Sequence, residues 1–432
     1  MSRPFSLAAL SSRYSPHKNP NPTPRTTTNT TTLTPETHPQ DLGAAILANM
    51  TGAPPPELST LSTLSTLVDP SNAGDPPGSA ASAVRRFASG LGTSAIQFPE
   101  LPTPTTTHPN PGSTDDDMPE LFCPGPIRDN PALGELINDH IMEWAEQIGI
   151  YPNNLDRLRT ANFGRLIMLT HPATNDPDRL LAAAKCIVAE WATDDYYVDE
   201  VTLGADPTIL GSRLAKLHAI VDPASLPARY TPQLDTYRKT EPIATAFRTA
   251  MEHLARYAST TQMSRFQHQM SILYLAWTQE ADWHTNHRTP PVWEYLVQRH
   301  LNSYLPPIIL IDVLAGYELP PNEFYDPQVR RAITLAGNAN VLLNDLHSSA
   351  NESDTDFNLP KVIMAEEHCD AHHAIKRTIE IHNELMRTFV AQATTLSLLG
   401  SPMLRRFFAD TWAWMGGSRE WHATTHRYHH PT

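Results

Sequence analysis

Cysteine is scarce in this sequence, and its use excludes two classes of small protein. The three cysteines, Cys123, Cys186 and Cys369, lie far apart and show no spacing typical of a metal site. Because their number is odd, they cannot form a complete set of disulfides. This usage excludes a disulfide-stapled secreted domain and a cysteine-based zinc module, and it predicts a reducing, cytoplasmic compartment.

Long apolar runs are also missing. The longest candidate, PPIILIDVLAGY, carries Asp312 and is far shorter than the roughly 20 apolar residues that a membrane helix needs. The N-terminus has only a short apolar patch, so we predict neither a membrane span nor a secretory signal. Residues 1–35 lack acids, which leaves a transit peptide as the alternative to a plain N-terminal arm.

Basic residues are too few to balance the acids. The formal net charge is −14, and residues 1–115 contribute little to it, with 6 basic and 7 acidic residues. The remaining 26 basic and 39 acidic residues make the rest of the chain strongly acidic. An acidic globular part argues against nucleic acid as a partner, because the phosphate backbone would be repelled.

Proline is abundant at the N-terminal end. Of the 40 prolines, 18 fall in residues 1–115, among tracts such as NPNPTPRTTTNTTTLTP. This segment has few residues able to form a core, so burial cannot offset the entropy cost of ordering it. We therefore predict a disordered Pro/Thr/Ser-rich arm over residues 1–115 and one folded domain over residues 116–432.

The folded part shows helical periodicity and almost no alternating strand pattern. Asn130 as the N-cap, Pro131 in the first turn and Gly149 as the C-cap predict a helix between them. Apolar residues at helical spacing continue in seven further segments, at 176–200, 243–258, 261–283, 291–317, 327–353, 371–399 and 402–428. We see no internal repeat, and we predict a single all-α domain.

An acidic motif, DDYYVDE, ends one of these helices at residues 194–200. Ile187, Trp191 and Asp195 follow steps of four, Asp199 extends the line, and Asp194 lies three residues after Trp191. Carboxylates on an inward face repel one another unless a cation lies between them, and clustered oxygen ligands suit Mg²⁺. The alternative interpretation is a solvated acidic helix end.

A second polar motif, NDLHSSANE, occupies residues 344–352 at the end of a segment that otherwise has an inward apolar face. Asn344, Ser348 and Glu352 are spaced by four residues, which places an amide, a hydroxyl and a carboxylate on one helix face. Three such oxygens can chelate one hard cation. Ordinary polar chemistry at a helix end is the alternative.

A third feature is the segment VQRHLNSYLPP. Pro306 and Pro307 cannot donate to the carbonyls of Asn302 and Ser303, so we predict a helix break there. Arg299 lies one turn before it, where a cation beside free carbonyl groups can hold an anion and orient a substrate. A plain proline kink is the alternative interpretation.

Together the three features predict a site that clamps a diphosphate. Two metal-binding faces, Arg299 and the C-terminal pair Arg427–Tyr428 would neutralise a leaving diphosphate, and an apolar interior would shelter the resulting carbocation. The aromatic candidates for that interior, each of which also fits plain core packing, are Trp191, Phe266, Tyr274, Trp277, Phe389, Trp412 and Trp414.

This combination resembles the class I terpene synthases. DDYYVD is similar to their aspartate-rich motif, NDLHSSANE to their N-D-x-x-S-x-x-x-E triad, Arg299 to their diphosphate-sensing arginine, and HRY to their C-terminal Arg-Tyr pair. Segments such as LFCPGPIRDNPALGE, TPPVWEYLVQRHLNSYLPP and SREWHATTHRY, with the Pro-rich arm, resemble the bacterial 2-methylisoborneol synthases more closely. The resemblance covers about residues 118–430.

The resemblance implies a class I terpenoid synthase bundle, often a homodimer, that uses Mg²⁺ and 2-methylgeranyl diphosphate. It implies Mg²⁺ ligands, for about three ions with diphosphate bound, at Asp194, Asp195, Asp199, Asn344, Ser348 and Glu352. It implies diphosphate contacts from Arg299, Arg427 and Tyr428, and linker and effector positions at Asn302 and Ser303. It also implies that Asp194, Arg299 and Tyr428 are the catalytic residues. Asn351 departs from the pattern, because many relatives carry a Lys there.

Several alternatives remain at this stage. The site could form 2-methylisoborneol by water capture, 2-methylenebornane by proton loss, or another monoterpene or sesquiterpene from an unmethylated prenyl diphosphate. A head-to-tail prenyltransferase would share the bundle but would normally show a second Asp-rich motif. A helical interaction protein would act through its arm, by binding a protein partner.

Overall fold

A computed structural model describes residues 118–199, 204–349, 356–425 and 427 of the chain. Within these ranges the regular structure is entirely helical, and no β-strand occurs. The prediction of an all-α fold is therefore confirmed for the described part. The predicted arm over residues 1–115 lies outside the described residues and stays a prediction.

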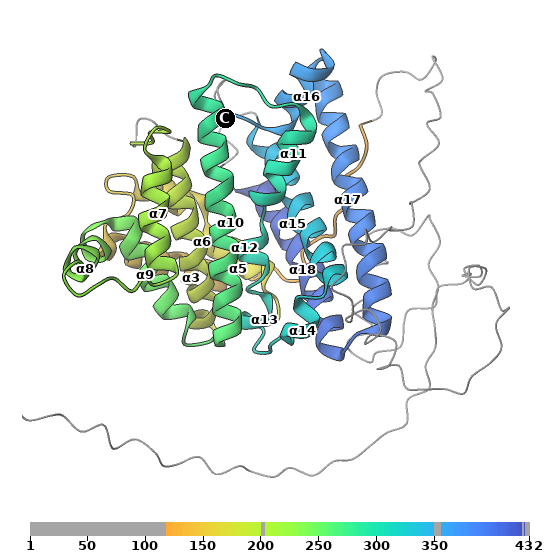
Figure 1. The fold of residues 1–432 in the computed structure, drawn as a ribbon. Helices are drawn as coiled ribbons and strands as arrows, with labels where there is room; N and C mark the ends of the chain where they lie inside the picture. The colour runs from red at the N-terminus through yellow and green to blue at the C-terminus, as the bar shows by residue number, and fades with distance from the viewer. Residues whose placement is uncertain (1–117, 200–203, 350–355, 426, 428–432) are drawn as a thin grey trace, which may run out of the picture. The chain divides into compact units, whose positions relative to one another are not determined.

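The helices follow one another with short connections (Figure 1). Their bounds are α3 Pro131–Ile148, α4 Leu155–Ala161, α5 Phe163–Thr170, α6 Pro177–Thr193, η1 Asp194–Asp199, α7 Leu210–Val221, α8 Thr231–Thr240, α9 Pro242–Leu254, α10 Thr260–Thr285, α11 Val292–Leu301, α12 Leu305–Ile308, α13 Ile311–Leu314, α14 Pro321–Phe324, α15 Pro327–Ser348, α16 Leu359–Glu367, α17 Ala371–Leu399 and α18 Pro402–Thr424.

The ends of the helices follow the capping signals in the sequence. Asn130 accepts a hydrogen bond from the Leu133 amide, Pro131 is the first residue of α3, and Gly149 ends that helix with a left-handed φ of 77°. At α10, Ser259 and Gln262 form a reciprocal capping box. Such caps satisfy the backbone groups that a helix end leaves without an internal partner.

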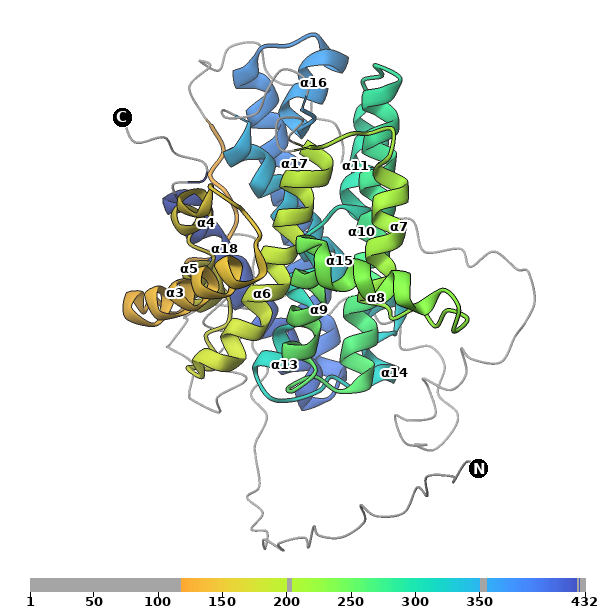
Figure 2. The ribbon, with the colours of Figure 1, turned by 90° about the vertical axis from the view of Figure 1, so that its left-hand side faces the viewer.

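Two groups of helices pack into the bundle. The first group joins α3, α5, α6 and α9, and the second joins α15, α16, α17 and α18, with α18 also packing on α5. Figures 1 and 2 show α16 at one end of the bundle and the short helices α13 and α14 at the other. The helix α11 packs against α16, so the residues of α11 lie toward the α16 end of the bundle.

The predicted helix break occurs between α11 and α12. The helix α11 ends at Leu301, and α12 begins at Leu305, so Pro306 and Pro307 lie in the first turn of the second helix. Proline is tolerated there because a first-turn N–H has no helical partner. A Cβ on Gly337 would lie only 2.9 Å from Leu305 Cγ, so this glycine lets α15 approach the break closely.

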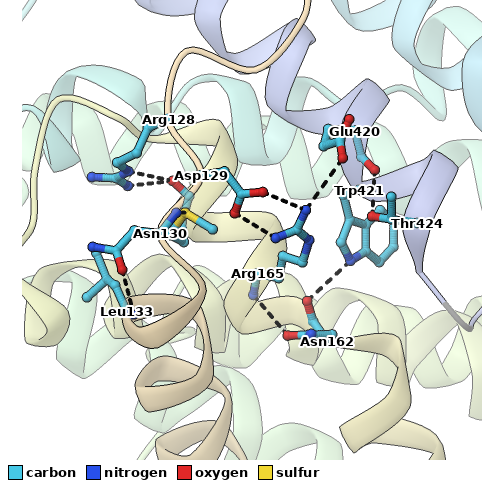
Figure 3. Close-up of polar contacts among 10 residues, drawn as sticks. Arg128, Asp129, Asn130, Leu133, Asn162, Arg165, Glu420, Trp421 and Thr424 are labelled. Atoms are coloured by element: carbon cyan, nitrogen blue, oxygen red, sulfur yellow. Dashed lines mark hydrogen bonds and ion pairs between the residues drawn. The ribbon is translucent and has the colours of Figure 1, made fainter.

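The end of α18 is tied to the turn between α4 and α5. Figure 3 shows Arg165 between Asp129 and Glu420. Its guanidinium lies 2.7 Å from the Asp129 carboxylate and 3.5 Å from the Glu420 carboxylate. Nearby, Trp421 Nε1 donates to the Ala161 carbonyl oxygen at 2.9 Å. These bonds fix the helix that leads into the C-terminal Arg-Tyr pair.

A fully buried ion pair lies deeper in the bundle. Arg265 Nη1 is 2.9 Å from Asp312 Oδ2, and both side chains are inaccessible to solvent. Burial raises the pKa of Asp312, while the Leu319 amide and Arg265 act to lower it. The guanidinium also lies over the Phe324 ring, 4.0 Å from its centroid. Arg265 therefore compensates a charge that has no access to water.

We expect Arg265→Met to destabilise the fold strongly, because it leaves Asp312 buried without its partner. Removing one member of a buried ion pair costs about 3–5 kcal/mol. Chemical denaturation at neutral pH would measure the loss, with Arg159→Met as the control, since Arg159 pairs with Asp139 on the surface. A loss no larger than that of the control would contradict this account.

Candidate active site

The acidic motif begins a short π-helix instead of continuing the α-helix before it. The helix α6 ends at Thr193, and η1 then spans Asp194–Asp199. A π-helix has a wider turn and occurs mostly as single turns, frequently at functional sites. The spacing of the acids in the sequence predicts an extension of the α-helical stripe, and the structure differs from that prediction by the wider turn.

Asp195 is the most firmly held residue of this motif. Its Oδ1 accepts from Arg157 at 3.1 Å and from Arg427 at 3.0 Å, and its Oδ2 accepts from the Tyr151 hydroxyl at 2.6 Å. Burial acts to raise the pKa of Asp195, but the guanidinium groups of Arg427 and Arg157 outweigh it and lower the pKa below its ordinary value. Asp195 therefore connects the acidic motif to the C-terminal arginine.

Asp194 lies in a more acidic environment. Desolvation, then the carboxylates of Asp195 and Glu280, raises the pKa of Asp194 to about 7, while Arg427 and Arg299 act in the opposite direction. The electrostatic influence of both arginines on one carboxylate means that three separate parts of the sequence converge here. A cation at this position would relieve the repulsion among the acids.

Asp199 belongs to the same group of acids. Its side chain keeps exposed surface, yet desolvation by the surrounding protein, followed by Asp194 and Glu280, raises its pKa. Glu190, one turn before Asp194 on α6, also has a raised pKa, through burial and then the charge of Asp194. The crowding extends over η1, the end of α6 and the side of α10.

The second motif lies on the last turns of α15. Ser348 is buried, and its hydroxyl has no hydrogen-bond partner among the described residues. One turn earlier, Asn344 Nδ2 lies 3.3 Å from His422 Nε2 on α18. Burial, and then the neighbouring His347, lowers the pKa of His422 to about 3, so its imidazole is neutral near pH 7.

Arg299 is paired with the residue that follows Asn344. Its Nη2 donates to Asp345 Oδ1 at 2.7 Å, and its Nε donates to the Tyr295 hydroxyl at 2.7 Å. Asp345 Oδ2 also accepts from Tyr295 and from the Leu359 amide at the start of α16. Burial raises the pKa of Asp345, and Arg299 acts to lower it. This network joins α11, α15 and α16.

The segment between α11 and α12 carries the predicted linker and effector positions. Asn302 is the C-cap of α11, and its N–H donates to the Gln298 carbonyl at 2.7 Å. Ser303 is buried, and its hydroxyl has no partner among the described residues. On α15, the fully buried Asn340 likewise has both amide atoms without a described partner. Polar atoms thus line this part of the interior.

Two of the predicted site residues cannot be placed. Glu352, the last member of the second motif, and Tyr428, the second member of the Arg-Tyr pair, lie outside the described residues. Arg427 is described, and its side chain is mostly buried against Asp195. The roles predicted for Glu352 and Tyr428 stay predictions.

The aromatic candidates fall into separate groups. Trp191 and Trp414 both contact Tyr304 at the helix break, with ring centroids 5.8 and 5.9 Å apart from it. Tyr274 and Trp277 stack on α10. The other three are buried elsewhere: Phe266 on α10, Phe389 against Phe408, and Trp412 against Phe122 near the start of the described chain. Only the Tyr304 group adjoins the break directly.

Several residues of the site were not identified from the sequence. Tyr151, Arg157 and Glu280 lie in segments without a motif. A single tyrosine, arginine or glutamate there does not indicate a functional site. Asp345 lies inside the quoted motif, and a buried acid beside a predicted inward face could have been matched to a cation such as Arg299. His422 adjoins the Arg-Tyr pair in sequence, but only the packing of α18 on α15 brings it to Asn344.

The residues present fit a hard divalent cation. The donors are carboxylates, an amide and hydroxyls, the carboxylates are crowded enough to raise one another's pKa, and the Ser348 oxygen is buried without a described partner. Oxygen donors of this kind are those that Mg²⁺ prefers.

Among the described helices, none combines the length and the hydropathy that a membrane span requires.

Comparisons with known proteins agree with this chemistry. The family model for terpene synthase family 2, C-terminal metal binding, matches residues 185–388. A 2-methylisoborneol synthase of Streptomyces ambofaciens is 34% identical over 82% of this chain and 82% of its own length. That of Saccharopolyspora erythraea is 36% identical over 71% of this chain and 89% of its own length.

A solved structure gives the same result for the fold. The 2-methylisoborneol synthase of Streptomyces coelicolor A3(2), in complex with Mg²⁺ and 2-fluoroneryl diphosphate, superposes with a TM-score of 0.68 at 33% identity. The match covers 72% of this chain and 97% of that one. From its fold, its metal-binding region and these relatives, the chain belongs to the class I terpene synthases, in terpene synthase family 2.

Proposed function

We propose that this terpene synthase ionises 2-methylgeranyl diphosphate and cyclises the cation to 2-methylisoborneol with release of diphosphate. The observation that carries the diphosphate chemistry is the convergence of Arg299, Arg427 and crowded carboxylates around Asp194. The choice of substrate is supported by the 2-methylisoborneol synthases among the relatives, at 34% and 36% identity. A second copy of the chain as partner, implied by the resemblance, is part of the same proposal.

The residues proposed to hold Mg²⁺ are Asp194, Asp195, Asp199, Asn344, Ser348 and Glu352. Bound Mg²⁺ supplies Lewis-acid stabilisation of charge on the leaving diphosphate. Asp195 already accepts from two guanidinium groups and a phenol, so we propose that it mainly orients Arg427 while it remains in reach of a cation. Asp194 and Asp199, whose pKa values are raised by neighbouring carboxylates, have the stronger need for a bound cation.

The arginines are proposed to grip the diphosphate. Arg299 and Arg427 each hold a carboxylate in this structure, at 2.7 and 3.0 Å, and a planar guanidinium can bind phosphate oxygens in the same manner. Tyr428 is proposed to donate its hydroxyl beside Arg427. Asn302 and Ser303, at the end of α11, are proposed to face the reacting end of the substrate, where carbonyl dipoles favour positive charge.

The interior is proposed to protect the carbocation. The rings of Trp191, Tyr304 and Trp414 lie together at the helix break, where their faces can stabilise positive charge and exclude water. The cation then ends either by capture of one water molecule, which gives an alcohol, or by loss of a proton, which gives an olefin. The proposed product requires the first ending.

The purified chain should therefore turn over prenyl diphosphates only when Mg²⁺ is present. Incubation with 2-methylgeranyl, geranyl and farnesyl diphosphate in parallel, followed by mass spectrometry of the volatile products, would test the substrate and the product together. We expect 2-methylisoborneol from the first substrate at the highest kcat/KM. Preference for an unmethylated substrate, or 2-methylenebornane as the main product, would overturn the specific assignment but not the family.

Asn344→Ala should lower kcat by about a hundredfold to a thousandfold, because one electrostatic contact to a developing charge has that typical effect. Steady-state kinetics at saturating Mg²⁺ and thermal melting on the same preparation would measure it. Asn338→Ala, the same substitution on the same helix six residues earlier, is the control. Near-normal turnover of Asn344→Ala would exclude Asn344 as a metal ligand.

Replacing Pro306 and Pro307 together by Ala should slow ionisation of the substrate. The prolines prevent α11 and α12 from joining into one helix, and joining would engage the carbonyls of Asn302 and Ser303. Because first-turn prolines cost a helix little, we expect thermal stability to change only slightly. Single-turnover kinetics would measure the step.

The pair Pro320 and Pro321, at the start of α14, offers a matched control for that double variant. Its replacement by Ala removes two adjacent prolines, the N-cap and the first residue of a short helix that lies at the end of the bundle opposite α16 (Figure 1). Equal single-turnover rates for the two double variants would mean that the break serves only the fold.

The N-terminal arm is proposed to be dispensable for the chemistry. A chain that begins at Asp116 keeps Phe122, whose amide donates to Asn383, and Cys123, and so keeps the first described contacts. We expect its kcat to equal that of the full chain. A folded but inactive shortened chain would contradict this and would mean that the chemistry requires the arm.

A further inference from the structure

His422 lies between the second polar motif and the helix break. It is fully buried on α18, and its Nε2 is 3.3 Å from Asn344 Nδ2 and 3.1 Å from the Tyr304 hydroxyl. Asn344 comes from α15 and Tyr304 from the segment before α12. One imidazole nitrogen therefore contacts two elements, α15 and the helix break, whose relative position matters for the proposed chemistry.

The other imidazole nitrogen fixes the tautomer. Nδ1 lies 2.8 Å from the Ser418 carbonyl oxygen, one turn earlier on α18. A carbonyl oxygen only accepts hydrogen bonds, so the proton of the neutral ring must be on Nδ1. Nε2 then carries a lone pair and acts as an acceptor toward its two neighbours.

This lone pair selects one orientation of the Asn344 amide. With Nδ2 toward Nε2, the amide donates a hydrogen bond; with the amide reversed, Oδ1 would place its lone pairs against that of the imidazole. The amide oxygen is accordingly turned away from His422. Only that oxygen can bind a hard cation, because the amide NH₂ group is a hydrogen-bond donor and not a metal ligand.

We propose that His422 is a positioning residue, which holds the Asn344 amide with its oxygen turned toward the bound Mg²⁺ and diphosphate. This rests on the proposed function, since it requires Asn344 to be a ligand of the cation. The chain Ser418 carbonyl, imidazole, Asn344 amide acts as an outer support, in the manner in which groups behind a metal site orient its ligands. Tyr304 shares the same nitrogen, so the support also connects the ligand to the helix break.

The substitution His422→Phe tests this directly, because it keeps a ring of similar volume and removes the acceptor. We expect the affinity for inorganic diphosphate in the presence of Mg²⁺, measured by titration calorimetry, to fall about fivefold, the effect of losing one ordinary hydrogen bond. His422→Gln should restore most of the affinity, because its amide oxygen can accept at nearly the position of Nε2.

A buried histidine away from the site provides the control. His382 on α17 is fully buried and contacts Asn383, and His382→Phe makes the same change there. We expect diphosphate affinity in the presence of Mg²⁺ to be unchanged in that variant. An equal loss in the His382 and His422 variants would mean that the loss reflects general loosening of the fold, and the proposal would fall.

A double-mutant cycle separates this inference from the proposed function. In an Asn344→Ala background, the further substitution of His422 by Phe should not lower the diphosphate affinity further, because the proposed effect of His422 on that affinity passes through the Asn344 amide. An undiminished effect there would overturn the positioning role. If Asn344→Ala alone left diphosphate affinity unchanged, the metal assignment of the proposed function would fail instead.

Discussion

The repulsion among carboxylates around Asp194 is the constraint on which the rest of the site depends. Asp194, Asp195, Asp199 and Glu280 lie close enough to affect one another's ionisation, and Asp195 among them is buried from solvent. Such groups stay charged only with cations beside them. The protein supplies some of these as Arg157, Arg299 and Arg427, and we propose that divalent ions neutralise the remaining negative charge.

The helical framework explains how residues distant in sequence reach this point. The π-helix η1, which follows α6, brings the aspartates, and α15 brings Asn344 and Ser348. The helix α11 brings Arg299, and α18 brings His422 and leads to Arg427. Short contacts hold these helices in place: Trp421 on the α4–α5 turn, and Asp345 between α11 and α16. Each contact joins an element that carries, or leads to, a charged residue of the candidate site.

Periodicity in the sequence located the long helices and the motifs, but it did not predict the helices α4, α5, α7, α8, α14 and α16 or the contacts between elements. Helical periodicity and caps such as Asn130 and Gly149 are local, and the structure contains them as expected. The π-helix at η1 was not predicted, because the acids continue the α-helical spacing in the sequence and nothing local indicates a wider turn. Glu280 and Tyr151 carry no local signal, since their importance arises only from their distance to the aspartates.

The helix break shows the same division in one segment. Pro306 and Pro307 predicted an interruption, and α11 and α12 are separate helices, as expected. The hydroxyl of Tyr304 inside that interruption contacts His422, and nothing in the sequence relates residues 118 positions apart. Local rules thus locate the features, and tertiary packing decides which of them meet.

Anomalous diffraction from crystals grown with Mn²⁺ and inorganic diphosphate would locate the metal ions. We expect metal peaks between the diphosphate and Asp194 on one side and between the diphosphate and Asn344 and Ser348 on the other, with Arg299 and Arg427 on the phosphate oxygens. Diphosphate bound without metal at these residues, or metal bound only elsewhere on the acidic surface, would contradict this expectation.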